Sequence, residues 1–489
     1  DYHVVGWFDS PQLFPRENAD GTPVPFTDQA WPEDLDRVKA PLRSERVYFH
    51  LMVPRKETSV RGQGLPAPVQ ILGHGYSSNR FDIATIGPYA AKQGLAVIAI
   101  DCVSHGIGLS PDEAQQAEDI HALVGLRPYL EAVTRRDRAY DHNNDQVADS
   151  GADFWTAYLF HTRDVVRQSA LDYMQLVRVL RGFDGTRRFG FDVNGDGKND
   201  LAGDFDGDGV VDIGGDASIG MMGASLGGIM SSVVSALEPE IAASIPIAAG
   251  GGLSDVGLRS YQGGVPQAVI LRVMGPLFIG TQSANEDSMR IETIIPNGNS
   301  DSRLQIAAAT DVQAGDFIVI ENLANESRGC GYVRDVNGEL QFRVSVESSL
   351  ADKLRLVIYD GDAMVLGSTE CGIADDATER QSIETFELDT QFQNRLYARD
   401  TPLQALAEGM GLKRNTPRLR RFLALGQLVL DGADPAVYAP LLKSKPMTYP
   451  GTGQTTGGHT LIVTTAGDMN VPASTGVNIA RAAGIVNYL

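Results

Sequence analysis

Residues 219–230 read IGMMGASLGGIM, and this stretch decides the fold. Its first four residues predict a short buried strand, and Leu226–Leu237, apolar or small throughout, predicts a helix. Between them, residues 223–227 match the pattern G-x-S-x-G. Glycine on both sides permits a sharp strand-to-helix turn that lifts a side chain above the sheet. We therefore expect the hydroxyl of Ser225 to stand at this turn as a nucleophile.

Apolar runs alternate with helical patterns on both sides of this turn. Strands are expected at 46–53, 69–72, 95–100, 241–249 and 461–465, and helices at 81–93, 161–181 and 474–483. Strands that are apolar on both faces are typical of parallel sheets covered by helices. Because crossovers between parallel strands are right-handed, this order predicts an α/β fold with a doubly wound, mostly parallel sheet.

The alternation breaks in the second half of the chain, where short strands follow one another. Strands are expected at 317–320, 341–346 and 354–359, with a turn at Asn337-Gly338. We expect an N-terminal wrapping segment (1–44), a first part of the core (45–285), a β-rich insertion (286–375) and a second part of the core (376–489). Helices at 402–410 and 419–430 are expected to cap that second part.

Bulk composition narrows the function. The 489 residues carry a formal net charge of −21, which argues against nucleic acid or an anionic membrane surface as the main partner. The most apolar stretch, 265–280, is shorter than the about 20 residues that span a bilayer, so no transmembrane segment is expected. It is interpreted as a buried or lid-forming segment. Cys330 and Cys371 are predicted to form a disulfide, which suits an oxidising compartment, and Cys102 to be a small buried residue.

A second motif, Gly73-His74-Gly75-Tyr76, follows the strand at 69–72. A tetrahedral intermediate of acyl transfer needs two preorganised N–H donors. We assign them to the backbone of Tyr76 and of Leu226, the residue after the serine. His74 is expected to brace the loop rather than to act as a base.

A third motif, GDMNVP at 467–472, follows the strand at 461–465. An aspartate in this place can orient an imidazole and stabilise its positive charge. Asp255, after the strand at 241–249, is the rival. Asp468 is favoured because Asp255 lies behind a flexible run of three glycines.

Taken together, GHG (73–75), DCVSHG (101–106), GASLGG (223–228) and GDMNVP (467–472) resemble the α/β-hydrolase superfamily. RDVVRQ (163–168) and QLVLDGADP (427–435) resemble segments of large secreted bacterial lipases and lysophospholipases of the virulence-factor type. The resemblance implies a secreted or cell-surface serine ester hydrolase that acts on a small-molecule or lipid-like ester.

The sequence departs from the superfamily in one respect. The catalytic histidine should follow the acidic residue, yet no histidine follows Asp468. His459 stands just before the strand at 461–465, about 20 Å from the catalytic end of that strand by strand geometry. His105 matches a structural loop position. We expect that a final strand and its histidine lie beyond Leu489. The alternative is an inactive α/β-hydrolase that serves as a binding or scaffold protein.

An acidic repeat precedes the central strand. Two units of nine residues, 192–200 and 204–212, repeat at a spacing of twelve. Oxygen ligands at loop positions 1, 3, 5 and 9, a carbonyl at 7 and glycine at 6 are typical of calcium loops. We expect two structural Ca²⁺ ions, since so many carboxylates would otherwise repel one another. The first ion is assigned Asp192, Asn194, Asp196, Lys198 (carbonyl), Asp200 and, closing the cage, Asp204. The second is assigned Asp204, Asp206, Asp208, Val210 (carbonyl), Asp212 and, closing the cage, Asp216.

Overall fold

The computed structural model describes most of the chain, in two compact units. Described residues are 2–18, 20–34, 43–123, 125, 138–142, 147–156, 158–192, 195–262, 265, 269–270, 272–296, 301–365, 367–368, 371–392 and 395–487. Unit 1 comprises Asp1–Ser260 and Gly426–Leu489, and unit 2 comprises Tyr261–Leu425. Unit 2 thus extends beyond the expected insertion at 286–375 at both ends.

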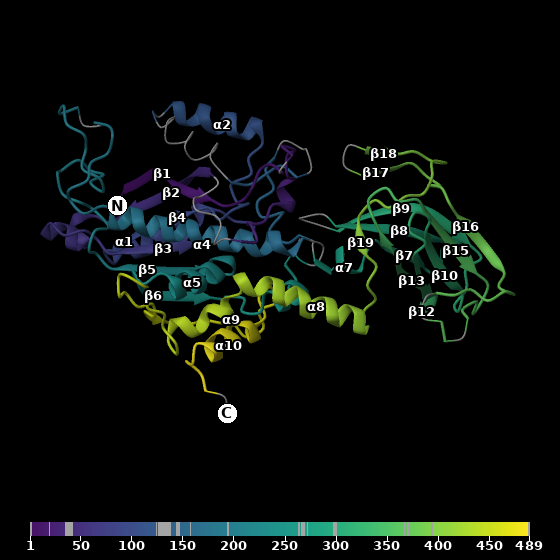
Figure 1. Ribbon diagram of the computed structural model, residues 1–489. Helices are drawn as coiled ribbons and strands as arrows, with labels where there is room; N and C mark the ends of the chain where they lie inside the picture. The colour runs from purple at the N-terminus through teal and green to yellow at the C-terminus, as the bar shows by residue number, and fades with distance from the viewer. Residues whose placement is uncertain are drawn as a thin grey trace. The chain divides into compact units, whose positions relative to one another are not determined.

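Unit 1 is built on a seven-stranded sheet in the order β1-β2-β4-β3-β5-β6-β20 (Figure 1). Its strands are β1 (Tyr2–Gln12), β2 (Arg43–Val53), β3 (Val69–Gly73), β4 (Ala96–Ile100), β5 (Ile219–Ala224), β6 (Ile241–Ile247) and β20 (His459–Thr460). From β4 to β20 all neighbours are parallel, whereas β2 is antiparallel to β4 and β1 to β2. This confirms the predicted mostly parallel sheet.

Helices connect these strands in two directions. They are α1 (Ile83–Lys92), α2 (Pro111–Ala122), α4 (Leu159–Arg181), α5 (Leu226–Leu237), α6 (Leu253–Arg259), α9 (Pro435–Tyr438) and α10 (Ala473–Ala482). The chain moves from β3 to β4 on one side and from β5 to β6 on the other. The strand order therefore reverses between β3 and β5. Because both crossovers are right-handed but run in opposite directions, α1 and α5 lie on opposite faces of the sheet. Ligand sites of open α/β sheets lie at the carboxyl ends of strands at such a switch point.

The N-terminal segment is more ordered than its sequence predicted. β1 pairs along its whole length with β2, from Tyr2 opposite Val53 to Gln12 opposite Arg43. Buried Asp172 of α4 binds this strand, accepting hydrogen bonds from Ser10 (2.6 Å) and Gln12 (3.1 Å). The expectation of an irregular wrapping segment over residues 1–44 was therefore wrong for β1, because its partners lie far away in the sequence.

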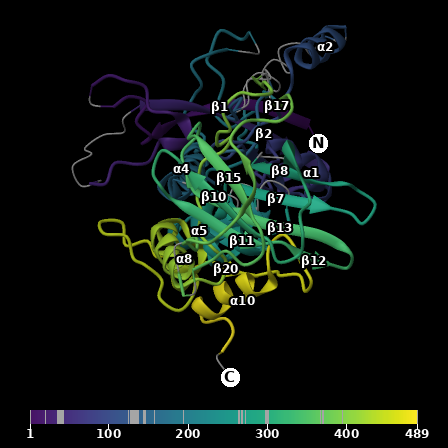
Figure 2. The same ribbon diagram turned by 90° about the vertical axis from the view of Figure 1, so that its right-hand side faces the viewer.

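Unit 2 consists mainly of two antiparallel sheets (Figure 2). One has the order β12-β13-β7-β8-β9 and the other β11-β10-β15-β16. The first contains β7 (Leu277–Gln282), β8 (Ser288–Pro296), β9 (Asp301–Thr310), β12 (Arg334–Val336) and β13 (Glu339–Ser345). The second contains β10 (Phe317–Asn322), β11 (Arg328–Tyr332), β15 (Leu354–Tyr359) and β16 (Glu379–Ile383). Short elements complete the unit: α7 (Arg272–Met274), β14 (Glu347–Ser348), β17 (Thr390–Phe392), β18 (Arg395–Tyr397) and β19 (Gly409–Met410). Helix α8 (Pro417–Leu430) begins in unit 2 and ends in unit 1.

Two expectations fail in unit 2 because tertiary pairing overrides the local pattern. The expected helix at 402–410 is extended instead, since Leu403 N–H donates to Glu384 (2.7 Å) and Ala405 N–H to Asp352 (2.9 Å). The apolar stretch 265–280 supplies part of β7, in the middle of the five-stranded sheet, where Phe278 is buried in the core. Its described part is a core element of unit 2. Across the described residues, no helix is long and apolar enough to cross a bilayer.

The predicted disulfide is present. Cys330 and Cys371 are bonded, with Cα atoms 5.7 Å apart and a sequence separation of 41. Cys102 is a buried free thiol, as expected. The bridge ties β11 to the loop that precedes β16.

Replacing both bridged cysteines with serine should destabilise unit 2. Closing a loop of this length restricts the unfolded chain, which is worth about 4 kcal/mol in the chain-entropy description. We expect calorimetry to show a lower unfolding temperature for one transition and little change in the other. Adding reductant should lower that transition in the parent protein but not in the double variant. Equal sensitivity of both proteins to reductant would contradict the assignment.

Candidate active site

Ser225 stands between β5 and α5 in a strained conformation. Its φ is 58° and its ψ is −117°, a region that residues with a side chain rarely adopt. Its N–H donates to Ile247 of β6 (3.0 Å), and its carbonyl accepts from Ile229 in the first turn of α5 (3.0 Å). The strand-to-helix turn predicted from the sequence is therefore present, with Ser225 half-buried at its apex.

Bare backbone is required around this turn. A Cβ on Gly227 would lie 2.1 Å from the carbonyl oxygen of Gly73, and one on Gly223 would lie 2.6 Å from the backbone of Gly227. A Cβ on Gly228 would lie 2.3 Å from the carbonyl oxygen of Ile247. Real side chains do not approach backbone so closely. The glycines of the motif thus let α5 descend onto β3 and β6.

The two proposed oxyanion donors occupy equivalent positions on neighbouring strands. Gly73 of β3 and Gly223 of β5 are register partners, and Tyr76 and Leu226 each follow three residues later. In the part of the chain that the structure describes, neither N–H has a protein acceptor. The Tyr76 ring packs against His105, at 6.1 Å between ring centroids. Burial raises the pKa of the Tyr76 phenol, so its side chain stays neutral.

Two buried histidines brace the loops beside Ser225. His74 Nε2 accepts from the backbone N–H of Cys102 (2.9 Å), so its proton is on Nδ1, which donates to Gly75 (2.8 Å). His105 Nδ1 donates to the Val103 carbonyl (2.9 Å), and burial lowers the pKa of His105 to about 3. The His74 ring thus joins two loops, as expected, whereas the His105 ring bonds within its own loop.

Asp468 lies in the loop after the edge of the sheet. Its Oδ1 accepts from the N–H groups of Asn470 (2.8 Å) and Val471 (2.9 Å). The chain before it runs parallel to β6, with Val463 bridged to Ile247. Ile247 also accepts from Ser225, so both loops leave the same end of the sheet.

The rival aspartate is engaged elsewhere. Asp255 forms an ion pair with Arg259 one turn later in α6 (3.0 Å), and its side chain is 38% exposed. A surface ion pair of this kind contributes little to the free energy of unfolding, but it directs the Asp255 carboxylate towards solvent. The arrangement favours Asp468 over Asp255.

No described imidazole is hydrogen-bonded to Ser225 or Asp468. His459 pairs with Ala243, four residues before Ile247, which places it about 13 Å below the catalytic end. This distance is shorter than the expected 20 Å, because Val463, which is bridged to Ile247, comes only four residues after His459. His142 and His161 both bind Asp153 (3.3 and 2.9 Å).

One contact that holds the loop after β6 was missed from the sequence. Buried Asp434 accepts from the N–H groups of Gly252 (2.9 Å) and Leu253 (2.6 Å) and so holds the loop after β6. It also caps α9 by accepting from Ala436 (2.8 Å). The local signal for the cap was visible, since aspartate followed by proline is typical of a helix start. The distant partners could not be read from the sequence.

The acidic repeat is also a structural repeat. Asp192 accepts from Gly195 (2.6 Å) and Gly197 (2.8 Å), and Asp204 accepts in the same way from Gly207 (2.7 Å) and Gly209 (2.8 Å). The next pair also matches: Asp196 accepts from the backbone of Lys198, and Asp208 from that of Val210. Asn194 lies outside the described residues.

The second loop brings its carboxylates together. Asp204, Asp206 and Asp208 each offer an oxygen within 4.8 Å of the other two, and among the described residues this is the group close enough to hold a metal ion. Protein cations also reach it. Lys56 contacts Asp206 (3.1 Å) and Asp208, and Arg61 contacts Asp206 (2.7 Å) and Asp212.

Two assigned ligand roles are not supported by this geometry. Asp216 is exposed and is not part of the three-carboxylate group, because Gly214 and Gly215 lead the chain onto the end of α4. Its closing role therefore stays a prediction that this geometry does not support. For the first loop, the described carboxylates do not converge as a group, and Asp204 turns to the second loop instead.

Ser225 does not line any of three pockets that lie among the described residues. One pocket lies wholly in unit 2.

Gly227→Ala should destabilise unit 1 by about 3 kcal/mol, because the added methyl group meets backbone that cannot move aside. Gly190→Ala is the matched control, since its Cβ would point into open space, and it should stay within about 0.5 kcal/mol of the parent. Denaturant unfolding measures both. Equal effects of the two substitutions would refute the close approach described here.

No protein-family model matches the sequence, and no curated protein matches it. Several solved esterases are similar in part. A ferulic acid esterase from Streptomyces cinnamoneus shares 13% identity over 51% of this chain and 59% of its own, with a TM-score of 0.25. An acetyl xylan esterase from Paenibacillus sp. R4 shares 17% identity over 45% and 54%, with a TM-score of 0.24. A cold-adapted esterase from an Arctic intertidal metagenomic library shares 13% over 41% and 54%, with a TM-score of 0.20. This chain thus spans about half the length of such structures, and TM-scores this low carry no argument about activity.

Proposed function

We propose that this chain is a serine ester hydrolase of the α/β-hydrolase type, with Ser225 as its nucleophile. The observation that carries the proposal is the strained backbone of Ser225 (φ 58°, ψ −117°) at the switch point of a mostly parallel sheet. Strain of this kind persists where the surrounding structure enforces it, and it is concentrated at functional sites. A turn between β5 and α5 that needed only to connect them could use glycine at this position.

In the proposed mechanism, Ser225 Oγ attacks the ester carbonyl and loses its proton to a histidine. The N–H groups of Tyr76 and Leu226 would stabilise the oxyanion, and their lack of protein acceptors supports this role. Collapse of the intermediate expels the alcohol and leaves an acyl-enzyme, which water then hydrolyses. Asp468 would orient the imidazole, because its Oδ2 is left for that contact while Oδ1 anchors its own loop.

The proposed substrate is an acyl ester of a small molecule or a lipid. The apolar stretch 265–280 gives no support for a lipid-like acyl chain, since its described part belongs to the core of unit 2. We propose a secreted or cell-surface location, which the disulfide favours because such bridges persist in oxidising compartments.

A second candidate function is a binding or scaffold role without catalysis. One observation favours it: none of the described imidazoles is hydrogen-bonded to Ser225 or Asp468. Without a base, a serine hydroxyl is a weak nucleophile.

We also propose a structural Ca²⁺ role for the acidic repeat, with the second loop as the stronger site. The convergence of Asp204, Asp206 and Asp208 and the glycine-rich turns support it. Lys56 and Arg61 already offset part of the charge, so repulsion alone does not require a metal.

Ser225→Ala should abolish labelling by a fluorophosphonate probe and reduce hydrolysis of p-nitrophenyl acetate and p-nitrophenyl palmitate by about a millionfold. The unfolding temperature should stay close to that of the parent, because only one oxygen is removed. Ser349→Ala, at an exposed turn of unit 2, is the matched control and should label normally. A parent protein that neither labels nor hydrolyses either ester would favour the scaffold role.

Calcium removal should lower the unfolding temperature of unit 1 by about 5 °C, because a ligand bound to the folded state stabilises it by mass action. Lys56→Met should raise calcium affinity by up to about fivefold, since Lys56 competes for Asp206 and Asp208. Titration calorimetry measures the affinity and elemental analysis the metal content. If chelator leaves the unfolding curve unchanged and no metal is found, the repeat is an acidic loop held by Lys56 and Arg61.

A further inference from the structure

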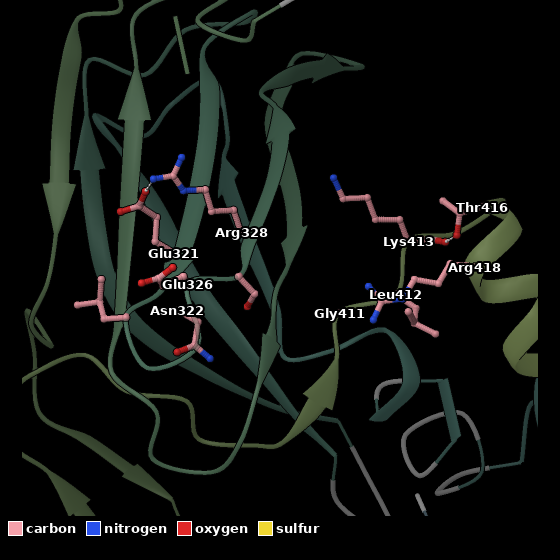
Figure 3. A pocket seen from close by; sticks show the side chains of 11 residues that line it. Glu321, Asn322, Glu326, Arg328, Gly411, Leu412, Lys413, Thr416 and Arg418 are labelled. Carbon is pink, nitrogen blue, oxygen red and sulfur yellow. Dashed lines mark hydrogen bonds and ion pairs between the residues drawn. The ribbon is translucent and has the colours of Figure 1, made fainter. Parts of the chain in front are cut away.

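Unit 2 contains a pocket of about 730 Å³ that the proposed ester hydrolysis does not use. Its size lies within the usual range of small-molecule sites. One wall comes from the end of β10 and the turn into β11, with Glu321, Glu326 and Arg328, and the other from the chain leading into α8, with Lys413 and Arg418 (Figure 3).

The second wall belongs to a strongly basic stretch. Residues 413–421 read KRNTPRLRR, with five cations and no acidic residue, in a chain whose net charge is −21. All five cationic side chains are exposed. Among the described residues, only Arg418 has a carboxylate partner, Glu347 at 3.3 Å. Because charges farther than about 8 Å are screened at physiological salt, this patch acts locally despite the acidity of the whole chain.

Ion pairing inside the pocket leaves two charges uncompensated. Glu321 is paired with Arg328 (2.7 Å) and lies 3.7 Å from Arg355. Neither Lys413 nor Glu326 has an oppositely charged partner within the described residues. The pocket thus offers a free ammonium on one wall and a free carboxylate on the other.

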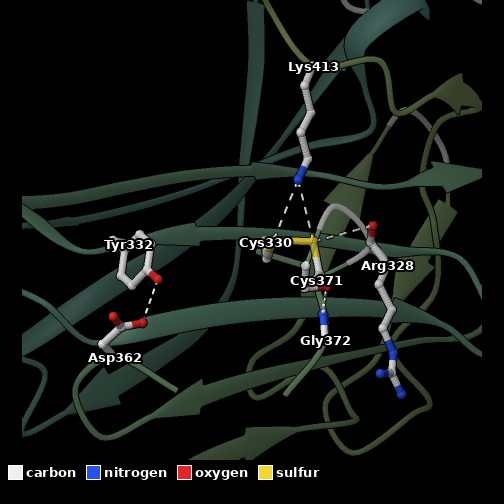
Figure 4. The surroundings of a disulfide bond; sticks show 8 residues. Arg328, Cys330, Tyr332, Asp362, Cys371, Gly372 and Lys413 are labelled. Carbon is white, nitrogen blue, oxygen red and sulfur yellow. Dashed lines mark hydrogen bonds between the residues drawn. A yellow bond between two sulfur atoms is a disulfide. The ribbon is translucent and has the colours of Figure 1, made fainter. Parts of the chain in front are cut away.

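The ammonium of Lys413 is held against the disulfide. Its Nζ lies 3.5 Å from Cys330 Sγ and 3.4 Å from Cys371 Sγ (Figure 4). Sulfur is a weak acceptor, so these contacts position the ammonium without neutralising it. Although the Lys413 side chain as a whole is exposed, partial burial of its ammonium lowers the pKa of Lys413, and an anionic ligand would reverse this shift.

The polar groups of the first wall are fixed in place. Ser327 donates to the Glu347 carbonyl (2.8 Å), and buried Asn322 donates to the same carbonyl (2.9 Å) and to Asp352 (2.8 Å). A wall held in this way is preorganised for a ligand.

We propose that this pocket binds an acidic saccharide, whose carboxylate or sulfate groups meet Lys413 and the basic stretch 413–421 while its hydroxyls donate to Glu326. The lining residues support this ligand class over others. They include no aromatic side chain on which a nucleobase could stack, and only Leu323 and Leu412 are apolar, which is too little for an acyl chain.

Calorimetric titration of the full chain tests this proposal with two acidic probes, a galacturonic acid hexamer and a heparin hexasaccharide, and with maltohexaose as the neutral counterpart. At least one acidic probe should bind, more weakly as salt rises, and maltohexaose should not. Lys413→Gln should weaken binding by about tenfold, as expected for a hydrogen bond to a charged group, and Lys413→Arg should largely restore it. Arg334→Gln, an equal charge change at an exposed position of β12 in the same unit, should have no effect. Ser225→Ala should also leave binding unchanged, which separates this site from the proposed hydrolase.

Several results would overturn the proposal. They are the absence of binding by both acidic probes, equal binding of maltohexaose, or equal losses in Lys413→Gln and Arg334→Gln. Binding to phosphatidylglycerol vesicles that depends on Lys413, without binding of either saccharide, would identify the patch as a lipid-surface contact instead.

Discussion

The close approach of glycine backbones at the head of β5 is the constraint on which the candidate site depends. Helix α5 can descend onto β3 only because Gly227 and Gly73 have no side chains between them. The chain must therefore turn from strand to helix within one residue, and Ser225 adopts a φ of 58°. Nearly every residue of α5 is buried, so the packing of the helix offsets the strain at Ser225, the residue that precedes it. The contacts that bury the helix therefore also place the half-buried serine at the apex of the turn.

Buried carboxylates hold the N-terminal strand and the loop after β6 in place. Asp172 binds β1 to α4, and Asp434 binds the loop after β6 through the N–H of Gly252. A buried charge is tolerated only where hydrogen bonds replace water, and both groups meet this condition. Two stretches resemble segments of secreted lipases: 163–168 lies in α4, and 427–435 contains Asp434. The contacts of Asp434 hold the scaffold together, so this resemblance says little about the substrate.

Elements with a local signal were predictable. Helix α5 was expected at its observed bounds, and the hairpin turn at Asn337-Gly338 follows from two residues that tolerate positive φ. The failures share a physical cause, because their stabilising partners are remote in the sequence. β1 is a strand through its pairing with β2, and 402–410 is extended because Leu403 and Ala405 donate to the carbonyls of Glu384 and Asp352. Ser225, Tyr76 and Leu226 follow the ends of β3 and β5, where the sequence predicted strand ends, and their roles in catalysis stay predictions.

Counts of charged residues along the sequence were a poorer guide to binding sites than sequence patterns were, because the fold decides which partners compensate a segment's charge. The acidic repeat looked unstable without metal, yet Lys56 and Arg61 come from a separate part of the chain to meet its carboxylates. The stretch 413–421 shows the converse: it lies in an acidic chain, but most of its cations have no carboxylate partner among the described residues. An ammonium that contacts only sulfur, as Lys413 does, gains much more from an incoming anion than a paired one would. The position of unpaired charge, rather than net charge, therefore indicates where this protein can bind an ion or an ionic ligand.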